Sequence, residues 1–500
     1  MPRNIKTKQL PRGAGILLPV SSLPSDYGIG TFGDEAFLFI DFLKQAGQKY
    51  WQVLPIGPTG FGDSPYQSFS AFAGNPYFID PGILIREGLL TAEEADSCDW
   101  GDNPANVDYA KLFHSRFKLL HTAFLRSEHG CKKEFLAFCK ENIYWLDDYC
   151  LFMSLKFQFD NQSWLHWPEK IRFHEPEAAE ACSRQLKNET EFWKFCQFKF
   201  FEQWNKVKEY ANQNDIRIIG DIPIYAALDS ADVWAHSGLF QLDADRRPVM
   251  VAGVPPDAFS KDGQLWGNPL YDWDAMERDG FDWWKQRMAY SAKRYDVIRI
   301  DHFIGVVRYY AIPAGNSTAA GGRWLPGPGS SLTDAIDSAI GSAHVIAEDL
   351  GVVVPQVRRL LNRTGYPGMK VLQFAFDGNP QNDHLPHNYI QNMVVYGGTH
   401  DNETLVGFAA AMKAKNAWFA KEYLGVKRKK DIPAALIRAA YESVANTAVF
   451  QAQDILFLPG SARLNFPSTI GTNWKWRLEK GQLTAKLAQR LNCLTKVYGR

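Results

Sequence analysis

Eight short apolar runs, separated by segments of helical periodicity, limit what this chain can fold into more than any other feature. The runs are rich in β-branched and aliphatic residues, which is typical of strands buried on both faces of a parallel sheet. Eight is the number of parallel strands that closes a (β/α)8 barrel, so we predict a TIM barrel of the α/β class. In chain order the runs are GILLPV (15–20), YWQVLPI (50–56), IRIIGDI (216–222), DVIRID (296–301), HVIAED (344–349), KVLQF (370–374), MVVYGGTHD (393–401) and DILFL (454–458).

Several intervening segments carry the start and stop signals of crossover helices. Residues 34–47 and 333–341 are periodic in apolar residues, and each segment ends in glycine. In 354–365, Pro355 suits the first helical turn and Gly365 suits the position after the last one. A strand followed by a helix, repeated along the chain, predicts a parallel sheet covered by helices.

Two intervals are too long for a simple crossover, so we interpret residues 1–500 as a single catalytic barrel with insertions. Residues 80–215 have helical periodicity and many Trp, Phe, Lys and Glu residues, which predicts an inserted, mostly helical subdomain. Residues 235–275 are rich in Gly, Pro and Asp, and they predict an irregular loop that lies over a site as a lid.

Charge and cysteine content exclude several classes of partner. The 55 basic residues balance 55 acidic ones without a run of like charge, so neither nucleic acid nor a membrane surface is an expected partner. Seven scattered cysteines without CxxC spacing predict reduced thiols and a cytoplasmic location rather than disulfides or a metal site. No window approaches the ~20 apolar residues of a membrane span. No P-loop or Gly-rich fingerprint predicts a cofactor.

Carboxylates stand at the ends of several apolar runs, namely Asp221, Asp301, Glu348 with Asp349, and Asp401. Any one of them could be a helix N-cap or part of a surface turn. In a barrel, however, the carboxyl ends of all strands open onto one mouth, where the catalytic groups of this fold lie. Several carboxylates at one mouth predict either a divalent metal site or glycoside chemistry.

The stretch VIRIDHFIG (297–305) favours glycoside chemistry. Arg299 and Asp301 are two residues apart on a strand and share a face, so the guanidinium would keep the carboxylate ionised and oriented as a nucleophile. The same fixed positive charge would oppose the binding of a metal cation. Glu348 ends an apolar run, where desolvation would raise its pKa, as a general acid requires. Asp349 would then be an N-cap or would support Glu348.

Motifs along almost the whole chain resemble one enzyme family. The sequence is similar to the amylomaltases, which are 4-α-glucanotransferases (disproportionating enzymes) of glycoside hydrolase family 77 and distant relatives of the α-amylases. The resemblance implies that Asp301 is the nucleophile, Glu348 the acid/base, and Asp401 the third carboxylate, which grips and distorts the donor sugar. The motifs are RGAGILLPVSSLPSDYGIG (12–30), FGDSPYQSFSAFAGNPYFID (61–80), GDIPIYAALDSADVW (220–234), GQLWGNPLY (263–271), RIDHFIG (299–305), AEDLG (347–351), GTHDNET (398–404) and NW (473–474).

Four further residues in these motifs are expected to bind substrate or support the nucleophile. Arg299 should orient Asp301, and Asp221 should contact the sugar or support such a contact. His400 should donate a hydrogen bond to the donor sugar, unless it is a satisfied core histidine. Tyr66 should stack on a pyranose ring, with core packing as the alternative.

Four more positions are expected on or near the acceptor side and the last strand. Gln264 and Trp266, in the predicted lid, would cover the acceptor and exclude water, which favours transfer over hydrolysis. Asn465, together with Arg463, matches a family pattern near the last strand, but these two residues could instead tie the barrel shut.

The resemblance therefore predicts a 4-α-glucanotransferase that moves a segment of α-1,4-glucan to the 4-hydroxyl of an acceptor. The reaction is expected to retain the α configuration and to need no cofactor or metal. Maltooligosaccharides and glucans derived from starch or glycogen are the expected partners. An α-amylase-like hydrolase is one alternative, although only about 40 residues follow the eighth run and no calcium loop is apparent. A second alternative is a catalytically inactive protein that binds glucans on its aromatic residues. Cyclisation, chain-length preference and oligomeric state, monomer or dimer, stay open.

Overall fold

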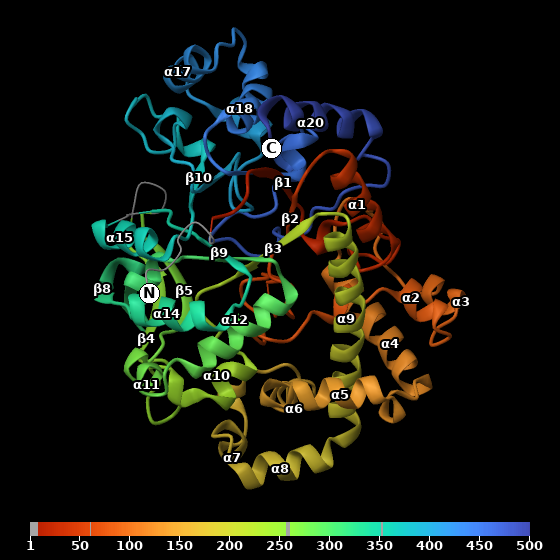
Figure 1. Ribbon diagram of the computed structural model, residues 1–500. Helices are drawn as coiled ribbons and strands as arrows, with labels where there is room; N and C mark the ends of the chain where they lie inside the picture. Colours follow the sequence, from red (N-terminus) through yellow and green to blue (C-terminus); the bar gives the residue numbers. More distant parts are fainter. Residues whose placement is uncertain (1–8, 61, 257–260, 352–353) are drawn as a thin grey trace.

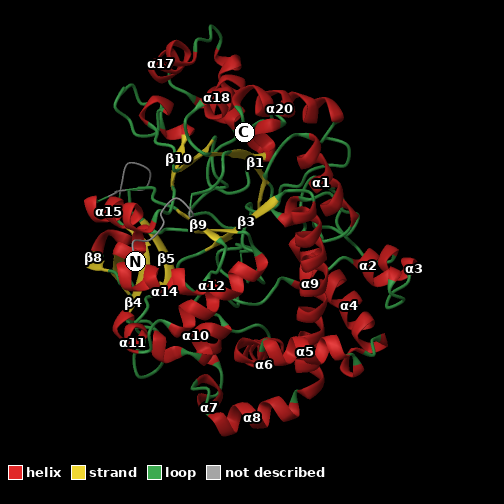
Figure 2. Cartoon of the chain, in the orientation of Figure 1, coloured by secondary structure: helices red, strands yellow, loops and turns green. Residues whose placement is uncertain are grey.

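Eight parallel strands form a closed barrel in the computed structural model, which describes residues 9–60, 62–256, 261–351 and 354–500 (Figures 1 and 2). The strands pair in the order β10-β11-β12-β1-β2-β3-β6-β9. The amide of Ala347 donates to the carbonyl of Pro367 at 3.0 Å where β9 meets β10, which closes the sheet and confirms the predicted TIM barrel. The strands are β1 (Gly13–Leu17), β2 (Tyr50–Gln52), β3 (Arg217–Ile222), β6 (Val297–Ile300), β9 (His344–Ala347), β10 (Gly368–Val371), β11 (Met393–Tyr396) and β12 (Thr447–Gln451).

Seven of the eight apolar runs overlap a barrel strand, and the prediction for the eighth is wrong. Residues 454–458 lie in helix α19 (Ala452–Ile455) and the turn after it, whereas the last strand is Thr447–Gln451. All five residues of this strand, TAVFQ, are buried. Because both ends of this strand are polar, it does not appear as an apolar run in the sequence. Ile455, in the predicted run, is buried as well, but it belongs to a helix. The run 370–374 is also only half a strand, since Leu372–Phe374 is a 3-10 helix.

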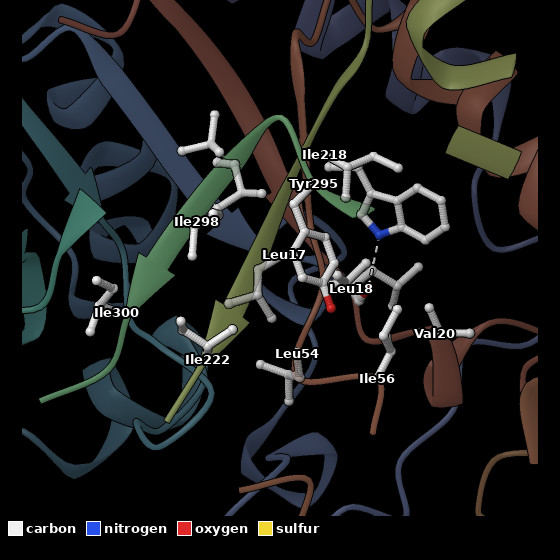
Figure 3. Close-up of a cluster of buried hydrophobic side chains, with 14 of the residues drawn as sticks. Leu17, Leu18, Val20, Leu54, Ile56, Ile218, Ile222, Tyr295, Ile298 and Ile300 are labelled. Carbon is white, nitrogen blue, oxygen red and sulfur yellow. Dashed lines mark hydrogen bonds between the residues drawn. The ribbon is translucent and has the colours of Figure 1, made fainter. Parts of the chain in front are cut away.

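Aliphatic side chains from neighbouring strands pack into the barrel core (Figure 3). Leu17, Ile218 and Ile298 are fully buried, and each such side chain contributes roughly 1.5–3 kcal/mol relative to exposure. The indole nitrogen of Trp51 donates to the carbonyl of Leu18 at 2.8 Å. Gly220 in β3 lets the Tyr295 ring lie against the strand, because a Cβ at position 220 would stand 2.2 Å from that ring.

The three helices predicted from start and stop signals are confirmed as α1 (Asp34–Gln45), α14 (Ser330–Ala339) and α15 (Pro355–Thr364). Pro355 stands in the first turn of α15, and Gly365 follows the last turn with φ of 74°, a left-handed conformation that favours glycine. Further helices around the barrel are α12 (Asp282–Arg294), α16 (Leu405–Ala411), α17 (Ala414–Leu424), α18 (Ile432–Glu442) and α20 (Ala485–Tyr498).

Most of residues 81–213, between β2 and β3, are helical, and these helices lie together on one flank of the barrel (Figure 1). The longest, α9 (Lys187–Gln213), packs against α6 (Ile143–Gln158) and reaches β3. That the interval 80–215 is a separate subdomain stays a prediction. None of the helices within the described residues combines the length and the apolar character that a membrane span requires. The remaining helices here are α2 (Pro81–Arg86), α3 (Ala92–Asp96), α4 (Tyr109–Arg126), α5 (Lys133–Glu141), α7 (Glu169–Arg172) and α8 (Pro176–Gln185).

The prediction of an irregular loop at 235–275 is wrong for much of that interval. It contains strands β4 (Met250–Val254) and β5 (Gln264–Pro269) and helix α11 (Trp273–Arg278); residues 257–260 lie outside the described residues. The two strands join β7 (Arg308–Pro313) and β8 (Arg323–Pro326) in an antiparallel sheet of order β5-β4-β7-β8. Because β7 and β8 lie outside the interval, its Gly- and Pro-rich composition could not reveal this pairing.

Candidate active site

The strand register places Asp301 and Glu348 side by side at the barrel mouth. Strands β6 and β9 are parallel, and their last paired residues are Ile300 and Ala347. Asp301 and Glu348 come directly after this pair, and the amide of Glu348 donates to the carbonyl of Ile300 at 3.1 Å. Because neighbouring strands lie about 4.7–4.9 Å apart, the two carboxyl side chains begin from adjacent positions.

Arg299 holds two carboxylates at once. Its Nη1 lies 2.7 Å from both carboxylate oxygens of Asp221 and 2.9 Å from Oδ1 of Asp301. Burial acts to lower the pKa of Arg299, but Asp221 and Asp301 outweigh it and raise that pKa well above the usual value. The guanidinium is therefore always charged. The predicted contact between Arg299 and Asp301 is present, and Asp221 is a second partner that the sequence did not reveal.

Glu348 is 8% exposed, and main-chain amides bind both of its carboxyl oxygens. The amide of His302 donates to Oε2 at 2.7 Å, and the amide of Leu350 donates to Oε1 at 2.9 Å. Burial, and next the negative charge of Asp301, raise the pKa of Glu348 to about 8, although Arg299 and the two amides oppose the shift. Glu348 is therefore protonated at neutral pH. The amides of His302 and Leu350 are already placed to stabilise its carboxylate once the proton has left. Its neighbour Asp349 instead accepts a hydrogen bond from the amide of Met369, which ties β9 to β10.

Asp401 follows β11 and stays ionised. Asn465 donates to its Oδ1 at 2.6 Å, and Nε2 of His400 lies 3.4 Å from its Oδ2. The side chain is 45% exposed, so the desolvation that opposes ionisation is incomplete. The charge of His400 and the hydrogen bonds from His400 and Asn465 outweigh that desolvation and lower the pKa of Asp401 to about 2. Arg463 donates to the carbonyl of Asp401, so Arg463 and Asn465 both hold this residue.

Tyr66 links the Arg299–Asp221 ion pair to His400. Its hydroxyl donates to Oδ2 of Asp221 at 2.9 Å and lies 3.3 Å from Nδ1 of His400. The Tyr66 and His400 rings stack with centroids 4.9 Å apart and planes 22° apart. The Trp474 ring stands 6.0 Å from each of these two rings.

A pocket of about 220 Å³ opens at this mouth. Gln264 and Trp266 on β5 line one side, and Nε1 of Trp266 donates to Oε1 of Gln264 at 3.1 Å. Tyr66, Asp301, His400, Asp401 and Asn465 also line the pocket, whereas Asp221, Arg299 and Glu348 are buried and do not. In the described residues, no group of three or more His, Cys, Asp or Glu side chains is arranged to hold a metal.

Several residues that line the same pocket have no role predicted from the sequence. Trp474 belongs to the NW motif, and Asn268 belongs to GQLWGNPLY. Motif membership was the only signal for either of them, since neither ends an apolar run. The full set of such residues is Ser64, Gln67, Pro223, Ile224, Tyr225, Asn268, His302, Pro467, Ser468 and Trp474.

Comparison with known proteins identifies the family. Residues 18–484 match the model of glycoside hydrolase family 77, described as 4-alpha-glucanotransferase. The chain belongs to this family. It is 46% identical over 483 residues to a 4-alpha-glucanotransferase of Clostridium butyricum, with 96% of this chain and 99% of that protein covered. A 4-alpha-glucanotransferase of Thermus thermophilus is 45% identical over 503 residues, covering 98% of this chain and 100% of that one.

Solved structures agree with the family assignment. The amylomaltase of Streptococcus agalactiae in complex with acarbose superposes with a TM-score of 0.95 and 41% identity, covering 98% of this chain and 99% of that one. An amylomaltase from Corynebacterium glutamicum, 17% identical with a TM-score of 0.75 and coverage of 98% and 75%, shares the fold. The chain is a 4-α-glucanotransferase that acts on α-1,4-glucans, so the predicted activity is confirmed.

Proposed function

We propose that this enzyme transfers α-1,4-glucan segments by retaining double displacement, with Asp301 as nucleophile and Glu348 as acid/base. The observation that carries the proposal is the adjacency of these two residues at the ends of the paired strands β6 and β9. Retaining enzymes keep their two working carboxyl groups about 5–5.5 Å apart, so that one attacks the anomeric carbon while the other protonates the leaving oxygen. Because neighbouring strands lie about 4.7–4.9 Å apart, side chains that start from their adjacent ends can reach such a separation, which supports the proposal.

The charges of the two carboxyl groups suit the first half-reaction. Arg299 is within 2.9 Å of Asp301 and orients the ionised nucleophile toward the anomeric carbon. Glu348 is protonated because it is buried and lies near the charge of Asp301, so it donates its proton to the departing 4-oxygen. The two main-chain amides on Glu348 then stabilise the carboxylate that this transfer leaves behind.

The same contacts reverse the role of Glu348 in the second half-reaction. When Asp301 is esterified by the sugar, its negative charge disappears, and with it one of the two causes that raise the pKa of Glu348. Arg299 and the two amides still lower that pKa, so Glu348 stays ionised. It then removes the proton from the 4-hydroxyl of an acceptor glucan, which attacks the covalent intermediate and rebuilds an α-1,4 bond.

The remaining pocket residues divide between the donor and the acceptor. Asp401, held by His400 and Asn465, binds the donor sugar. Tyr66, whose hydroxyl donates to Asp221, supports the same donor subsite. Gln264 and Trp266 cover the acceptor side as part of a lid, where excluding water favours transfer. We propose maltooligosaccharides and glucans derived from starch or glycogen as the substrates, and the scattered cysteines support a cytoplasmic location.

Incubation of the pure protein with maltotriose tests the proposal. Glucose together with a ladder of longer maltooligosaccharides is expected, and Asp301→Ala should abolish both while glucan binding persists. The matched control Asp34→Ala removes a carboxylate that is 77% exposed and should behave as the wild type does. Glucose and maltose alone would indicate a hydrolase. Full activity in Asp301→Ala would show that the nucleophile is misassigned.

A further inference from the structure

Strand β5 departs from regular pairing where it borders the active-site pocket. It is the edge strand of the sheet β5-β4-β7-β8. Between the pairs Val251–Pro269 and Gly253–Leu265, three residues of β5 stand opposite one residue of β4. Residues 266–268 therefore form a β-bulge. Bulges are common beside active sites, where they redirect side chains out of the regular alternation of a strand.

The bulge directs two side chains to the pocket. Gly267, at its centre, has φ of 78°, a left-handed conformation that favours glycine. A Cβ at position 267 would meet no other atom of the described residues within 4 Å, so the backbone angle, and not a lack of space, favours glycine there. Trp266 and Asn268, on either side, both line the pocket, whereas Leu265 is 40% exposed.

Asn268 ties the bulge to the barrel through both ends of its side-chain amide. The residue is 5% exposed. Its Nδ2 donates to the carbonyl of Ala226 at 2.9 Å, in the loop that follows β3, and its Oδ1 accepts from Nε2 of Gln67 at 3.0 Å. Gln67 directly follows Tyr66, so both partners of Asn268 belong to loops at the barrel mouth.

Main-chain carbonyls fix the orientation of the two side-chain amides. A carbonyl can only accept, so the group of Asn268 that faces Ala226 must be Nδ2, which leaves Oδ1 for Gln67. Nε2 of Gln67 also lies 3.5 Å from the carbonyl of Trp266. Gln67 therefore turns its donor group to the bulge, and a single arrangement of the two amides satisfies all of these contacts.

The position of the Trp266 ring depends on this tie. The indole meets the His302 ring edge to face, with centroids 4.8 Å apart, and its Nε1 donates to Gln264. A tryptophan side chain has only two rotatable bonds, so both contacts require the backbone of residue 266 to stay in place. A shift of the bulge would therefore move the ring away from the acceptor side.

We propose that Asn268 is a positioning residue, which holds the bulge against the barrel and keeps the Trp266 ring over the acceptor side. It thereby sets how the covalent intermediate divides between a glucan and water, because a displaced ring would admit water to the intermediate. In hydrolysis the oxygen of water replaces Asp301 on the anomeric carbon, and Glu348 takes the proton, as it does from a glucan hydroxyl. The inference rests on the proposed function and adds to it a residue that controls the choice of acceptor.

Initial rates with α-maltosyl fluoride and glucose test this role. The value of kcat/KM for fluoride release measures attack by Asp301, maltotriose is the product of transfer to glucose, and maltose is the product of hydrolysis. Asn268→Leu keeps the approximate size of the side chain and removes both hydrogen bonds. Its ratio of maltose to maltotriose at a fixed glucose concentration should rise about tenfold, since a small misplacement of a positioned group can change rates up to ~100-fold. Its kcat/KM for fluoride release should change by less than about twofold.

Two further positions separate the bulge from a general loss of stability. Gly267→Ala strains the left-handed backbone without a new contact, so it should raise the same ratio. Gly267→Asn should raise it less, because asparagine adopts this conformation more readily than alanine. Gln241→Leu is the matched control. It removes a hydrogen bond of the same kind outside the bulge, from Nε2 to the carbonyl of Tyr271 at 2.9 Å, and should leave the ratio unchanged.

Fluorine NMR of enzyme labelled with 5-fluorotryptophan reports on the ring without turnover. The Trp266 signal is assigned by its loss in Trp266→Phe. This signal should shift or broaden in Asn268→Leu and in Gly267→Ala, and it should keep its position in Gln241→Leu.

The ratio and the signal together decide the role of Asn268. An unchanged ratio or an unchanged Trp266 signal in folded Asn268→Leu would overturn the inference, even if the melting temperature falls. Equal losses in fluoride release and in transfer would also overturn it. If Asn268→Leu does not fold, the same outcomes in Gly267→Ala decide. A wild type that makes maltose but no maltotriose would instead reject the proposed function.

Discussion

Arg299 is the cation on which the charge state of the site depends, so its replacement by methionine is the most informative perturbation. The Arg299 side chain is 4% exposed and that of Asp221 is 0% exposed, and Nη1 lies 2.7 Å from both Asp221 oxygens. Removing one partner of a buried ion pair costs about 3–5 kcal/mol of unfolding free energy, because the other charge stays buried alone. We expect a loss of this size in Arg299→Met at pH 7. Catalysis should fall ~100-fold, since Asp301 loses the group that orients it.

The stability loss should depend on pH in a defined direction. Burial raises the pKa of Asp221, and Arg299 is the first group that opposes this, so removing Arg299 raises the pKa further. A carboxyl group with a raised folded-state pKa contributes stability below its unfolded pKa of ~4 and loses that contribution as pH rises through the folded value. The deficit of Arg299→Met relative to the wild type should therefore be small near pH 4 and grow toward pH 8.

Urea denaturation of three variants between pH 4 and 8 provides the assay. The double variant Arg299→Met/Asp221→Asn removes both charges and should recover more than half of the loss. Arg358→Met breaks a surface pair with Asp383 whose side chains are 67% and 56% exposed, so it should cost under about 1 kcal/mol. The reasoning is refuted if Arg299→Met costs no more than Arg358→Met, or if the double variant is no more stable than the single one.

Two further predictions concern buried carboxyl groups. Because burial and Asp301 raise the pKa of Glu348 to about 8 and Glu348 must be protonated to donate, kcat/KM for maltotriose should fall above that pH. Fluoride leaves α-maltosyl fluoride without a proton, so kcat/KM for this donor should not fall in the same way. An identical alkaline decline of kcat/KM for both donors would argue against Glu348 as the acid. Burial also raises the pKa of Asp454 to about 7, and its Oδ2 has no hydrogen-bond partner among the described residues. Protonated Asp454 therefore contributes to the unfolding free energy near pH 4, and this contribution is lost as pH rises through 7. The unfolding free energy should fall by up to ~1.4 kcal/mol per pH unit on this account. Asp454→Asn should flatten that decline in unfolding free energy between pH 5 and 8, whereas an unchanged profile would rule out Asp454 as its source.

The barrel and the contact between Arg299 and Asp301 could be predicted because their signals are local. Arg299 lies in β6 and Asp301 directly follows the end of that strand, so a two-residue spacing was enough to predict that they share a face. The link between Arg299 and Asp221 needed the register of β3 against β6, which no single stretch of sequence contains. The contact between Asn465 and Asp401 joins residues 64 positions apart, and only the family motif hinted at it.

Elements whose pattern is set by distant partners escaped prediction. Strand β12 is buried throughout, yet its Thr447 and Gln451 interrupt the apolar run by which a strand is recognised. Strand β5, QLWGNP, contains polar residues, glycine and proline, and the short apolar strand β4, MVAGV, pairs with β5 on one side and with β7, which lies outside the interval, on the other. The left-handed backbone of His302 likewise depends on tertiary contacts, so its amide contact with Glu348 could not be read from RIDHF.

Azide rescue of α-maltosyl fluoride turnover tests the assignment of the two carboxyl groups most directly. In Glu348→Ala, Asp301 still forms the covalent intermediate, because fluoride leaves without a proton, and azide then displaces it from the opposite face. The product should be the α-maltosyl azide. In Asp301→Ala, azide must attack the donor itself and should give the β-azide. A β-azide from Glu348→Ala, or an α-azide from Asp301→Ala, would contradict the account.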